Sequence, residues 1–272
     1  MADLPQHPHF PTRFERGVLY ATLNRPEARN AMTQDMVLAI RALFEAVRDD
    51  RSVRAIVLRG AGGHFCAGGD LKEMLASGVS PIVDGEADPI ATNSRVFGET
   101  LQLIQAAPQV VIVICEGAVL GGGVGLTCVS DIAFAKTDAK FGLPETVRGL
   151  LPAQIAPFVV ERIGLTQARR LCLTGAFFDG AEALRLGLVH EGFADEAELS
   201  AKLDATLAQV LNCAPVANAV TKEILLDVGH KSMSVVLDDA AQKFAEAVRG
   251  SEAPEGVTAF VQKRKPKWAN PA

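Results

Sequence analysis

Two glycine-rich turns, each joining an apolar run to a helical pattern, constrain this fold more than other features of the sequence do. One turn, at 60–69, follows an apolar run at 54–58, and the other contains the glycine triplet at 121–123 after the run VVIVIC at 110–115. Consecutive glycines pack no side chains and weaken helices and strands, so a chain retains them where bare backbone must approach something closely. A further glycine, Gly125, lies just beyond the triplet.

The same order of strand, turn and helix occurs nearer the N-terminus. A β-like run at 18–23 leads through a turn at 24–27 to a helical pattern at 35–49, for which Thr33 is the expected N-cap. A further strand is expected at 132–135. Strands that alternate with helices at this spacing predict an α/β fold with buried, largely parallel strands.

Composition and charge exclude several classes of protein. A chain of 272 residues is long enough for one large domain, and its net charge of -5 offers no basic field to nucleic acid or to an anionic membrane. The five cysteines are scattered, which indicates reduced thiols. The sequence contains no cluster of His and Cys residues of the kind that would indicate a metal site. The N-terminus shows no signal-peptide pattern and no apolar run is long enough to span a bilayer, so we expect a soluble, cytoplasmic protein.

The chain changes character near residue 195. We expect an α/β core at 1–195 and a helical region at 196–272. A helical region of this kind has no obvious nucleus of its own, so it is expected to pack on the core or on a neighbouring subunit. The segment 76–92 has little periodicity and contains prolines and glycines, which indicates a surface loop or short helix that forms a lid or a wall of the substrate site.

Known glycine-rich nucleotide motifs do not fit the two turns. The Rossmann fingerprint fails because its third glycine would fall on Leu126 or Cys128. The P-loop pattern fails because Gly69 and Asp70 stand where Lys and then Ser or Thr are required. Tight packing alone would explain either turn by itself. Taken together, the turns lead into two helix N-termini and would aim two backbone N–H groups at one point, as an oxyanion hole requires.

Five segments together resemble the enoyl-CoA hydratase/isomerase family, also called the crotonase superfamily. They occur in the family's order and span essentially the whole chain. The resemblance implies a ClpP/crotonase-type fold of repeated ββα units forming a spiral, with a C-terminal helical domain used in trimerisation and often a dimer of trimers. It also implies an acyl-CoA substrate, with coenzyme A as part of that substrate and no separate cofactor. The segments are LNRPEARNAM at 23–32, HFCAGGDL at 64–71, GAVLGGGVGL at 117–126, DIAFAKTDAKFGLPE at 131–145 and AFVQKRKPKW at 259–268.

The resemblance assigns catalytic roles to three residues. In family members the oxyanion hole is formed by the backbone N–H of the residue before the aspartate of the AGxD motif and by that of the middle glycine of the triplet, here Gly69 and Gly122. These amides would bind the thioester oxygen as it gains enolate charge, an interaction that is stronger in the transition state than in the ground state. The family's hydratases commonly use two glutamates, and the second, in the FGxPE motif, is Glu145.

The first of the two glutamates is absent, and its position is Gly125. A single base suits a Δ3-Δ2 enoyl-CoA isomerase, which moves a proton by way of an enolate. Hydration is the alternative reaction if another group orients the water. The candidates for that group are a side chain of the 76–92 loop, Glu116 or a carboxylate of the substrate. A member that binds acyl-CoA or a protein partner without turnover is the alternative outside enzymes.

The run at 142–171 bears on this choice. It resembles hydratases of branched, carboxylated enoyl-CoAs, of the methylglutaconyl or isohexenylglutaconyl kind, more than it resembles fatty-acid isomerases. We therefore favour a hydro-lyase with Glu145 as acid/base and keep the isomerase as the alternative. In a hydro-lyase of this kind we expect Gly125 to leave room for a bulkier or charged acyl group.

Contacts with coenzyme A are also implied, in the residues after the NRP turn, in the AGxD loop and in the basic C-terminal run. A solvated helix end explains the basic run equally well, and Asp70 is also expected to cap the helix that follows it. His64 is expected to be a loop residue and Cys66 a packing residue, since neither has a neighbour in sequence that would activate it. The positions implied for coenzyme A are Glu27, Ala28, Arg29, Ala67, Asp70, Leu71, Phe260 and Lys263.

Overall fold

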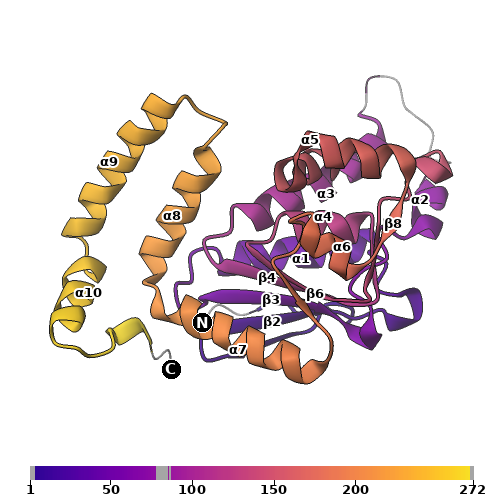
Figure 1. The fold of residues 1–272 in the computed structure, drawn as a ribbon. Helices are drawn as coiled ribbons and strands as arrows, with labels where there is room; N and C mark the ends of the chain where they lie inside the picture. The colour runs from indigo at the N-terminus through magenta and orange to yellow at the C-terminus, as the bar shows by residue number, and fades with distance from the viewer. Residues whose placement is uncertain (1–3, 78–84, 86, 270–272) are drawn as a thin grey trace.

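The computed structural model describes residues 4–77, 85 and 87–269. In this part of the chain a six-stranded sheet has the order β1-β2-β3-β4-β6-β9 (Figure 1). From β2 onward neighbouring strands run parallel, whereas β1 pairs with β2 in the antiparallel direction. The predicted α/β class with parallel strands is therefore confirmed. The strands are β1 Thr12–Glu15, β2 Val18–Leu23, β3 Ala55–Gly60, β4 Val110–Cys115, β6 Ile132–Lys136 and β9 Glu191–Phe193.

Both faces of the main sheet are covered, which is why its central strands are continuous apolar runs. Val111 and Val113 of β4 point into one buried cluster, and Ile112 and Ile114 point into another. Apolar side chains of α7 (Glu196–Asn212) complete the second cluster. The beginning of the C-terminal helical region therefore packs on the α/β core.

Helices cover the sheet and continue beyond it. The first begins at the predicted N-cap, where the Thr33 hydroxyl oxygen accepts a hydrogen bond from the Met36 N–H at 3.2 Å. Within the described ranges, none of the helices has the length and apolar character needed to cross a membrane. Besides α7, the helices are α1 Gln34–Val47, α2 Leu71–Ser77, α3 Pro89–Gln105, α4 Gly122–Cys128, α5 Ala156–Thr174, α6 Gly180–Arg185, α8 Pro215–Asp227, α9 Met233–Arg249 and α10 Glu252–Val261.

A smaller sheet brings the two glycine-rich turns together. Cys66, in the first turn, donates its N–H to Ala118 O and accepts from the Leu120 N–H, both at 2.9 Å. The first turn is thereby held beside the strand that leads into the second turn. The sequence pattern does not predict this sheet, because its strands are too short to show alternation. In order across the sheet, the strands are β5 Ala118–Leu120, β7 Lys140–Gly142 and β8 Phe177–Phe178.

The segment expected to be a loop or short helix at 76–92 is helical at both ends. α2 reaches Ser77, and α3 begins at Pro89 with the Asp88 carboxylate accepting from the Ile90 N–H at 2.8 Å. Residues 78–84 and 86, on which the lid expectation also falls, lie outside the described residues. The pattern misses the start of α3 because a proline is also a turn signal, although it is favourable in the first turn of a helix.

Helices α8 to α10 form an arm that projects from the α/β core (Figure 1). Two contacts fix its base. Lys222 of α8 donates to the Asp131 carboxylate at 2.6 Å. Arg54, just before β3, donates to Trp268 O at 3.0 Å and also to Cys213 O, so it ties the end of α7 and the C-terminal segment to the core.

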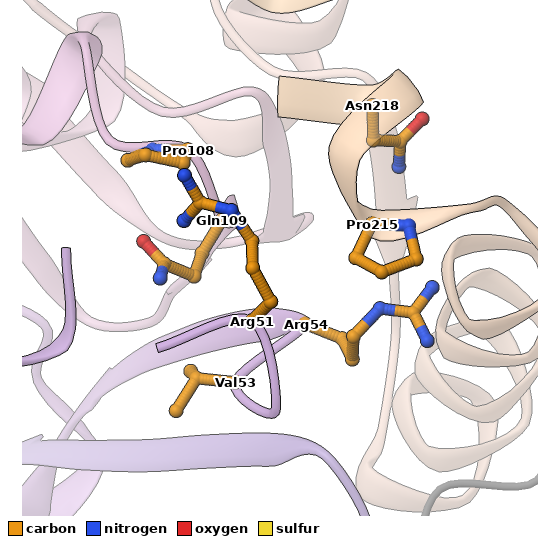
Figure 2. Close-up of a pocket in the computed structure, with 7 residues that line it drawn as sticks. All are labelled: Arg51, Val53, Arg54, Pro108, Gln109, Pro215 and Asn218. Atoms are coloured by element: carbon orange, nitrogen blue, oxygen red, sulfur yellow. The ribbon is translucent and has the colours of Figure 1, made fainter. Parts of the chain in front are cut away.

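Figure 2 shows a small pocket at this joint between core and arm. In this view Arg54 points toward the arm, close to Pro215. None of the residues to which the sequence assigns chemistry lines the pocket, so we interpret it as a packing feature of the joint. The lining residues are Arg51, Val53, Arg54, Pro108, Gln109, Pro215 and Asn218.

Replacing Lys222 by Met is expected to lower the free energy of unfolding by about 1–3 kcal/mol, because the partly buried Asp131 carboxylate loses its cation. The double variant Lys222→Met/Asp131→Asn is expected to be more stable than the single variant, since the uncompensated charge is removed as well. Urea unfolding at one fixed protein concentration measures both. A single variant as stable as the unchanged protein would contradict the anchoring role of this pair.

Candidate active site

The first glycine-rich turn directs the N–H of Gly69 away from the chain that flanks it. Met32 donates its N–H to Gly68 O at 2.8 Å, and Met32 O accepts from the Asp70 N–H at 2.9 Å. In this parallel bridge the residue between the two contacts, Gly69, turns its own N–H to the opposite side. Within the described residues no hydrogen bond occupies that N–H, so it is available to a ligand.

The second turn makes Gly122 the first residue of α4. The N–H groups of the first helical turn have no partner within the helix, so the Gly122 N–H is directed outward. Gly121, before it, has φ of 50° and donates to Gly142 O at 3.0 Å. The first helical bond runs from the Gly125 N–H to Gly121 O at 3.0 Å. The positive φ of Gly121 is thus what redirects the chain from β5 into α4.

The two turns approach so closely that side chains do not fit between them. A Cβ atom on Gly68, whose φ is 98°, would lie 3.1 Å from Leu120 O and 3.6 Å from Gly122 N. A Cβ atom on Gly122 would lie 2.7 Å from Met32 Cε. The glycines therefore serve close approach of backbone to backbone. They place the amides of Gly69 and Gly122 at neighbouring positions, which is the arrangement that an oxyanion hole requires.

Glu145 lies directly against the second turn. The Gly121 hydrogen bond to β7 fixes the turn beside the segment that carries Glu145. A Cβ atom on Gly121 would lie 2.5 Å from Glu145 Oε1, so the carboxyl group contacts the backbone that precedes Gly122. The other oxygen, Oε2, is buried and has no hydrogen-bond partner in the described structure. A buried polar atom without a partner is uncommon and marks a candidate functional group.

Burial raises the pKa of Glu145 above the ordinary value of a glutamate, because the charged form loses its solvation. The backbone N–H of Glu145 and the charge of Arg148 oppose this shift. A carboxyl group with a raised pKa exchanges its proton more readily at neutral pH. Glu145 therefore combines the position and the electrostatics that acid/base catalysis requires.

Apolar side chains of neighbouring elements form walls around these polar groups. Phe97 Cζ of α3 lies 3.3 Å from the Cβ position of Gly122, close to Met32. Met74 Sδ of α2 lies 3.4 Å from the Cβ position of Gly69. This lining suits an apolar acyl chain. Phe97 and Met74 were not among the predicted site residues, because apolar residues on a helix cannot be distinguished from core residues by their spacing.

Gly125 does not leave the additional room that we expected there. A Cβ atom at this position would lie 2.5 Å from Ile155 Cγ2 and 3.5 Å from Leu101 Cδ1. Both side chains are buried, with exposed fractions of 3% for Ile155 and 0% for Leu101. The expectation of a roomier site is therefore wrong, since apolar groups from α3 and from the start of α5 fill the space.

Glu116, a candidate for orienting water, is engaged in a structural ion pair. Its two carboxylate oxygens accept from Arg59 Nε at 2.7 Å and from Arg59 Nη2 at 3.0 Å. Arg59 also pairs with Glu196 at the start of α7. Arg59 of β3 therefore links Glu116, which follows β4, to the start of α7. Glu116 is thus held by Arg59, which favours a structural role over a catalytic one.

The two loops implied in coenzyme A binding lie side by side. The Ala67 N–H donates to Arg29 O at 3.0 Å, which joins the AGxD loop to the turn after β2. Glu27 and Ala28 lie in the short 3-10 turn of that segment, and Leu71, 42% exposed, begins α2. The structure therefore brings these five implied residues to one edge of the candidate site.

Asn30 is a site-forming residue that the sequence reasoning missed. It is fully buried, with an exposed fraction of 0%, and its φ is 57°. Its side-chain amide donates to Ala61 O at 2.8 Å and to His64 O at 2.6 Å, and its side-chain oxygen accepts from the Arg25 N–H at 2.8 Å. Asn30 therefore fastens the first glycine-rich turn to the turn after β2. The signal for it is an asparagine in a turn, the residue type other than glycine that best tolerates positive φ.

Asp70 has the capping role that we expected. Its carboxylate accepts from the N–H groups of Lys72 at 3.0 Å and Glu73 at 3.3 Å. Arg25 Nη2 also donates to it at 3.0 Å. Because protein groups engage both carboxylate oxygens, a contact of this carboxylate with coenzyme A has no support in the geometry.

Phe260 belongs to α10, the last helix of the arm, and Lys263 follows that helix. Figure 1 places α10 away from α2 and α3, so a single chain does not bring these two residues to Glu145. Phe260 is 84% exposed. In the same basic run, Arg264 donates to the Glu255 carboxylate at 2.7 Å and is thereby partly neutralised.

His64 and Cys66 are structural, as expected. His64 Nδ1 accepts a hydrogen bond from the Ala118 N–H at 3.0 Å, which helps to join the first turn to β5. Cys66 is fully buried, and burial raises the pKa of its thiol to about 12. A thiol in that state is not a nucleophile at neutral pH. All five cysteines are free.

Glu145→Gln is expected to be more stable than the unchanged protein at neutral pH. Because the pKa of Glu145 is raised on folding, the folded chain binds the proton more tightly, and stability falls as the pH rises through this raised pKa. Glutamine does not ionise, so the variant does not lose this stability as the pH rises. The difference in unfolding free energy should shrink toward and below about pH 4.3, the ordinary glutamate pKa, where both states hold the proton. Urea unfolding between pH 4 and pH 8 measures it, and a difference that grows on acidification would contradict the assignment.

Comparisons with known proteins show the family to which this chain is related. A family model described as enoyl-CoA hydratase/isomerase matches residues 13–271. The solved structure of Pseudomonas aeruginosa AtuE is 59% identical, with a TM-score of 0.92, and the match covers 96% of this chain and 99% of that one. A probable enoyl-CoA hydratase of Bacillus subtilis is 33% identical over 252 residues, which cover 92% of this chain and 95% of the relative. The 2,3-dehydroadipyl-CoA hydratase of Escherichia coli is 29% identical over 255 residues, 93% of this chain and 96% of the relative.

These matches extend over the α/β core and the helical arm alike. The high TM-score to AtuE over 96% of the chain agrees with the crotonase-like fold that the five sequence segments predicted. The family model matches almost the whole sequence, in agreement with the resemblance that the five segments showed. The chain belongs to the enoyl-CoA hydratase/isomerase family.

Proposed function

We propose that this protein is a hydro-lyase that adds water to an enoyl-CoA thioester through an enolate bound by the amides of Gly69 and Gly122. The main support is the position of Glu145. Its carboxyl group lies against Gly121, next to those two amides, and one of its oxygens is buried without a partner. An acid beside two unoccupied backbone donors suits proton transfer at the carbon next to a thioester.

In the hydration direction, the water oxygen bonds to the β-carbon of the enoyl group, and the electrons of the double bond move toward the thioester oxygen. The N–H groups of Gly69 and Gly122 donate to that oxygen as it becomes negative. Protonated Glu145 gives its proton to the α-carbon, and the proton lost by the water returns to Glu145. One water molecule is added, and the acid is regenerated. Removing one donor of this type typically costs about 2.7–4 kcal/mol of transition-state stabilisation.

We propose a branched or carboxylated acyl group, of the methylglutaconyl or isohexenylglutaconyl type, as the substrate. With Gly125 in place of an acid and Glu116 held by Arg59, the described residues offer Glu145 as the acid of this site. A carboxylate on the substrate supplies a second group that can hold the water. The name of the Escherichia coli relative, 2,3-dehydroadipyl-CoA hydratase, specifies a dicarboxylic enoyl-CoA and is consistent with this choice.

The second candidate is a Δ3-Δ2 enoyl-CoA isomerase. The observation that favours it is the same single acid, because an isomerase needs one group that removes a proton and returns it elsewhere. A third candidate, a member that binds acyl-CoA or a protein without turnover, has less support. The raised pKa of Glu145 and the orphan oxygen of its carboxyl group would have no purpose in a protein that only binds.

We also propose a homotrimer or a dimer of trimers, in which the arm of one chain covers a neighbour. Exposed apolar side chains on the arm support this, since large apolar patches on a surface indicate an interface. Phe260 and Lys263 would then contact the coenzyme A bound to the adjacent chain. The reaction needs no cofactor beyond that coenzyme A, and the free thiols suit a cytoplasmic location. The most exposed apolar residues of the arm are Leu225, Met233, Leu237, Phe244, Val257, Phe260 and Val261.

Glu145→Gln is expected to lower kcat by about a hundredfold to ten-thousandfold, the usual contribution of a general acid or base, while acyl-CoA affinity changes little. Steady-state kinetics and calorimetric titration measure the two quantities. Glu99→Gln, which changes an exposed glutamate of α3, is the matched control and should retain turnover. Full activity of Glu145→Gln would refute the catalytic assignment.

The reaction is identified by incubating crotonyl-, 3-hexenoyl- and 3-methylglutaconyl-CoA with the protein in deuterated water and measuring the masses of the products by mass spectrometry. We expect 3-methylglutaconyl-CoA to gain one water and crotonyl-CoA to react much more slowly, because it carries no carboxylate. A shift of the double bond with deuterium incorporation but no added water would make the protein an isomerase. No exchange of α-protons in any thioester of the panel would favour the non-catalytic alternative.

A further inference from the structure

Gly125 is not required by the backbone conformation of α4. It is absent from the positive-φ glycines of the described chain, and it makes regular helical bonds, from its N–H to Gly121 O at 3.0 Å and from the Val129 N–H to its own oxygen at 3.2 Å. Glycine is a poor helix former, so a helix retains it at such a position for another reason. The surroundings of Gly125 indicate that this reason is space.

Ile155 occupies the space that a side chain at position 125 would need. Its Cγ2 and Cβ atoms lie 2.5 Å and 3.3 Å from the Cβ position of Gly125. The Ile155 N–H donates to Pro152 O at 3.2 Å, and Ile155 O accepts from the Val159 N–H at 3.0 Å, so its backbone is fixed at the start of α5. Because the branch point itself is in contact, rotation of the isoleucine side chain does not clear the space.

The blocked space faces the proposed reacting groups. Side chains on a helix lean toward its N-terminus, so a side chain at position 125 would extend over Gly121 and Gly122. Glu145 Oε1 lies 2.5 Å from the Cβ position of Gly121. A carboxylate at position 125 would therefore lie across from Glu145, where Ile155 and Leu101 now place methyl groups.

We propose that Ile155 determines the reaction specificity of this protein by excluding a second carboxylate from the site. Because Ile155 and Leu101 make this wall of the site apolar, the protein positions the attacking water poorly when the acyl group has no polar group of its own. Simple enoyl-CoAs are then poor hydration substrates, and thioesters that carry their own carboxylate are favoured. This inference rests on the proposed function, in which Glu145 and the two glycine amides act on an acyl-CoA.

The test is a set of variants assayed on crotonyl-CoA, which has no carboxylate. Gly125→Glu alone is expected to have a lower melting temperature, because the new side chain meets Ile155. Gly125→Glu/Ile155→Ala is expected to melt close to Ile155→Ala and to hydrate crotonyl-CoA at least about tenfold faster than the unchanged protein. In that variant the introduced carboxylate accepts a proton from the attacking water while Glu145 gives its proton to the α-carbon. Proton exchange with solvent then restores both groups.

Val159→Ala provides the matched control, because Val159 is as deeply buried as Ile155 and lies one turn further along α5. Gly125→Glu/Val159→Ala should gain neither stability nor crotonyl-CoA hydration relative to Gly125→Glu. The gain in the double variant with Ile155→Ala should disappear when Glu145→Gln is added. That loss would tie the new activity to the proposed site.

Two results would overturn the inference. One is a Gly125→Glu variant that melts like the unchanged protein, because Ile155 would then block nothing. The other is a folded Gly125→Glu/Ile155→Ala variant that binds crotonyl-CoA but hydrates it no faster than Ile155→Ala does. If that double variant fails to fold, the smaller change Gly125→Ala decides: it should lower the melting temperature in the unchanged protein but not in Ile155→Ala. Failure of the proposed function itself would be distinguishable, as the unchanged protein would then add no water to 3-methylglutaconyl-CoA.

Discussion

The close approach of two backbone turns is the constraint on which the rest of this structure depends. Gly68 and Gly122 lie so near each other that a single added carbon would meet backbone atoms or Met32. Strand β5 and the first turn are joined by hydrogen bonds through Cys66, and Asn30 fastens that turn from the other side. These contacts fix the backbone around Gly69 and Gly122, so in the proposed function the two amides are prepositioned and need no reorganisation during the reaction.

Glu145 shows how the same close packing controls protonation. Its carboxyl group is pressed against Gly121 and partly removed from water, and this desolvation raises its pKa. Ile155 and Leu101 keep the neighbouring space apolar, so within the described residues no second carboxylate is placed beside it there. A site with one acid and an apolar wall differs from a site with two opposed acids. In the proposed function, the substrate supplies the second carboxylate, which the apolar wall does not provide.

Much of the fold follows from local patterns. The strands at 18–23 and 110–115, the Thr33 cap and the helices after residue 195 were each predicted from apolar spacing or from capping chemistry. The strands β5, β7 and β8 were missed because two or three residues carry no period. Helix α3 was not predicted, and its start at Pro89 falls in the segment expected to be a loop or short helix, where proline gives a turn signal in a position that also suits a helix.

The sequence by itself determined the class of fold and the two glycine-rich turns, and through its family resemblance it pointed to Glu145 as the candidate acid, because glycine triplets and the FGLPE segment are recognised from consecutive residues. Only the tertiary structure decided what Gly125 means. The glycine suggested room, but Ile155 and Leu101 fill it from α5 and α3. It likewise decided that Arg59 holds Glu116 and that Arg25 holds Asp70. Contacts between elements distant in sequence depend on how helices and strands pack, and that packing leaves no trace in the spacing of residues along the chain.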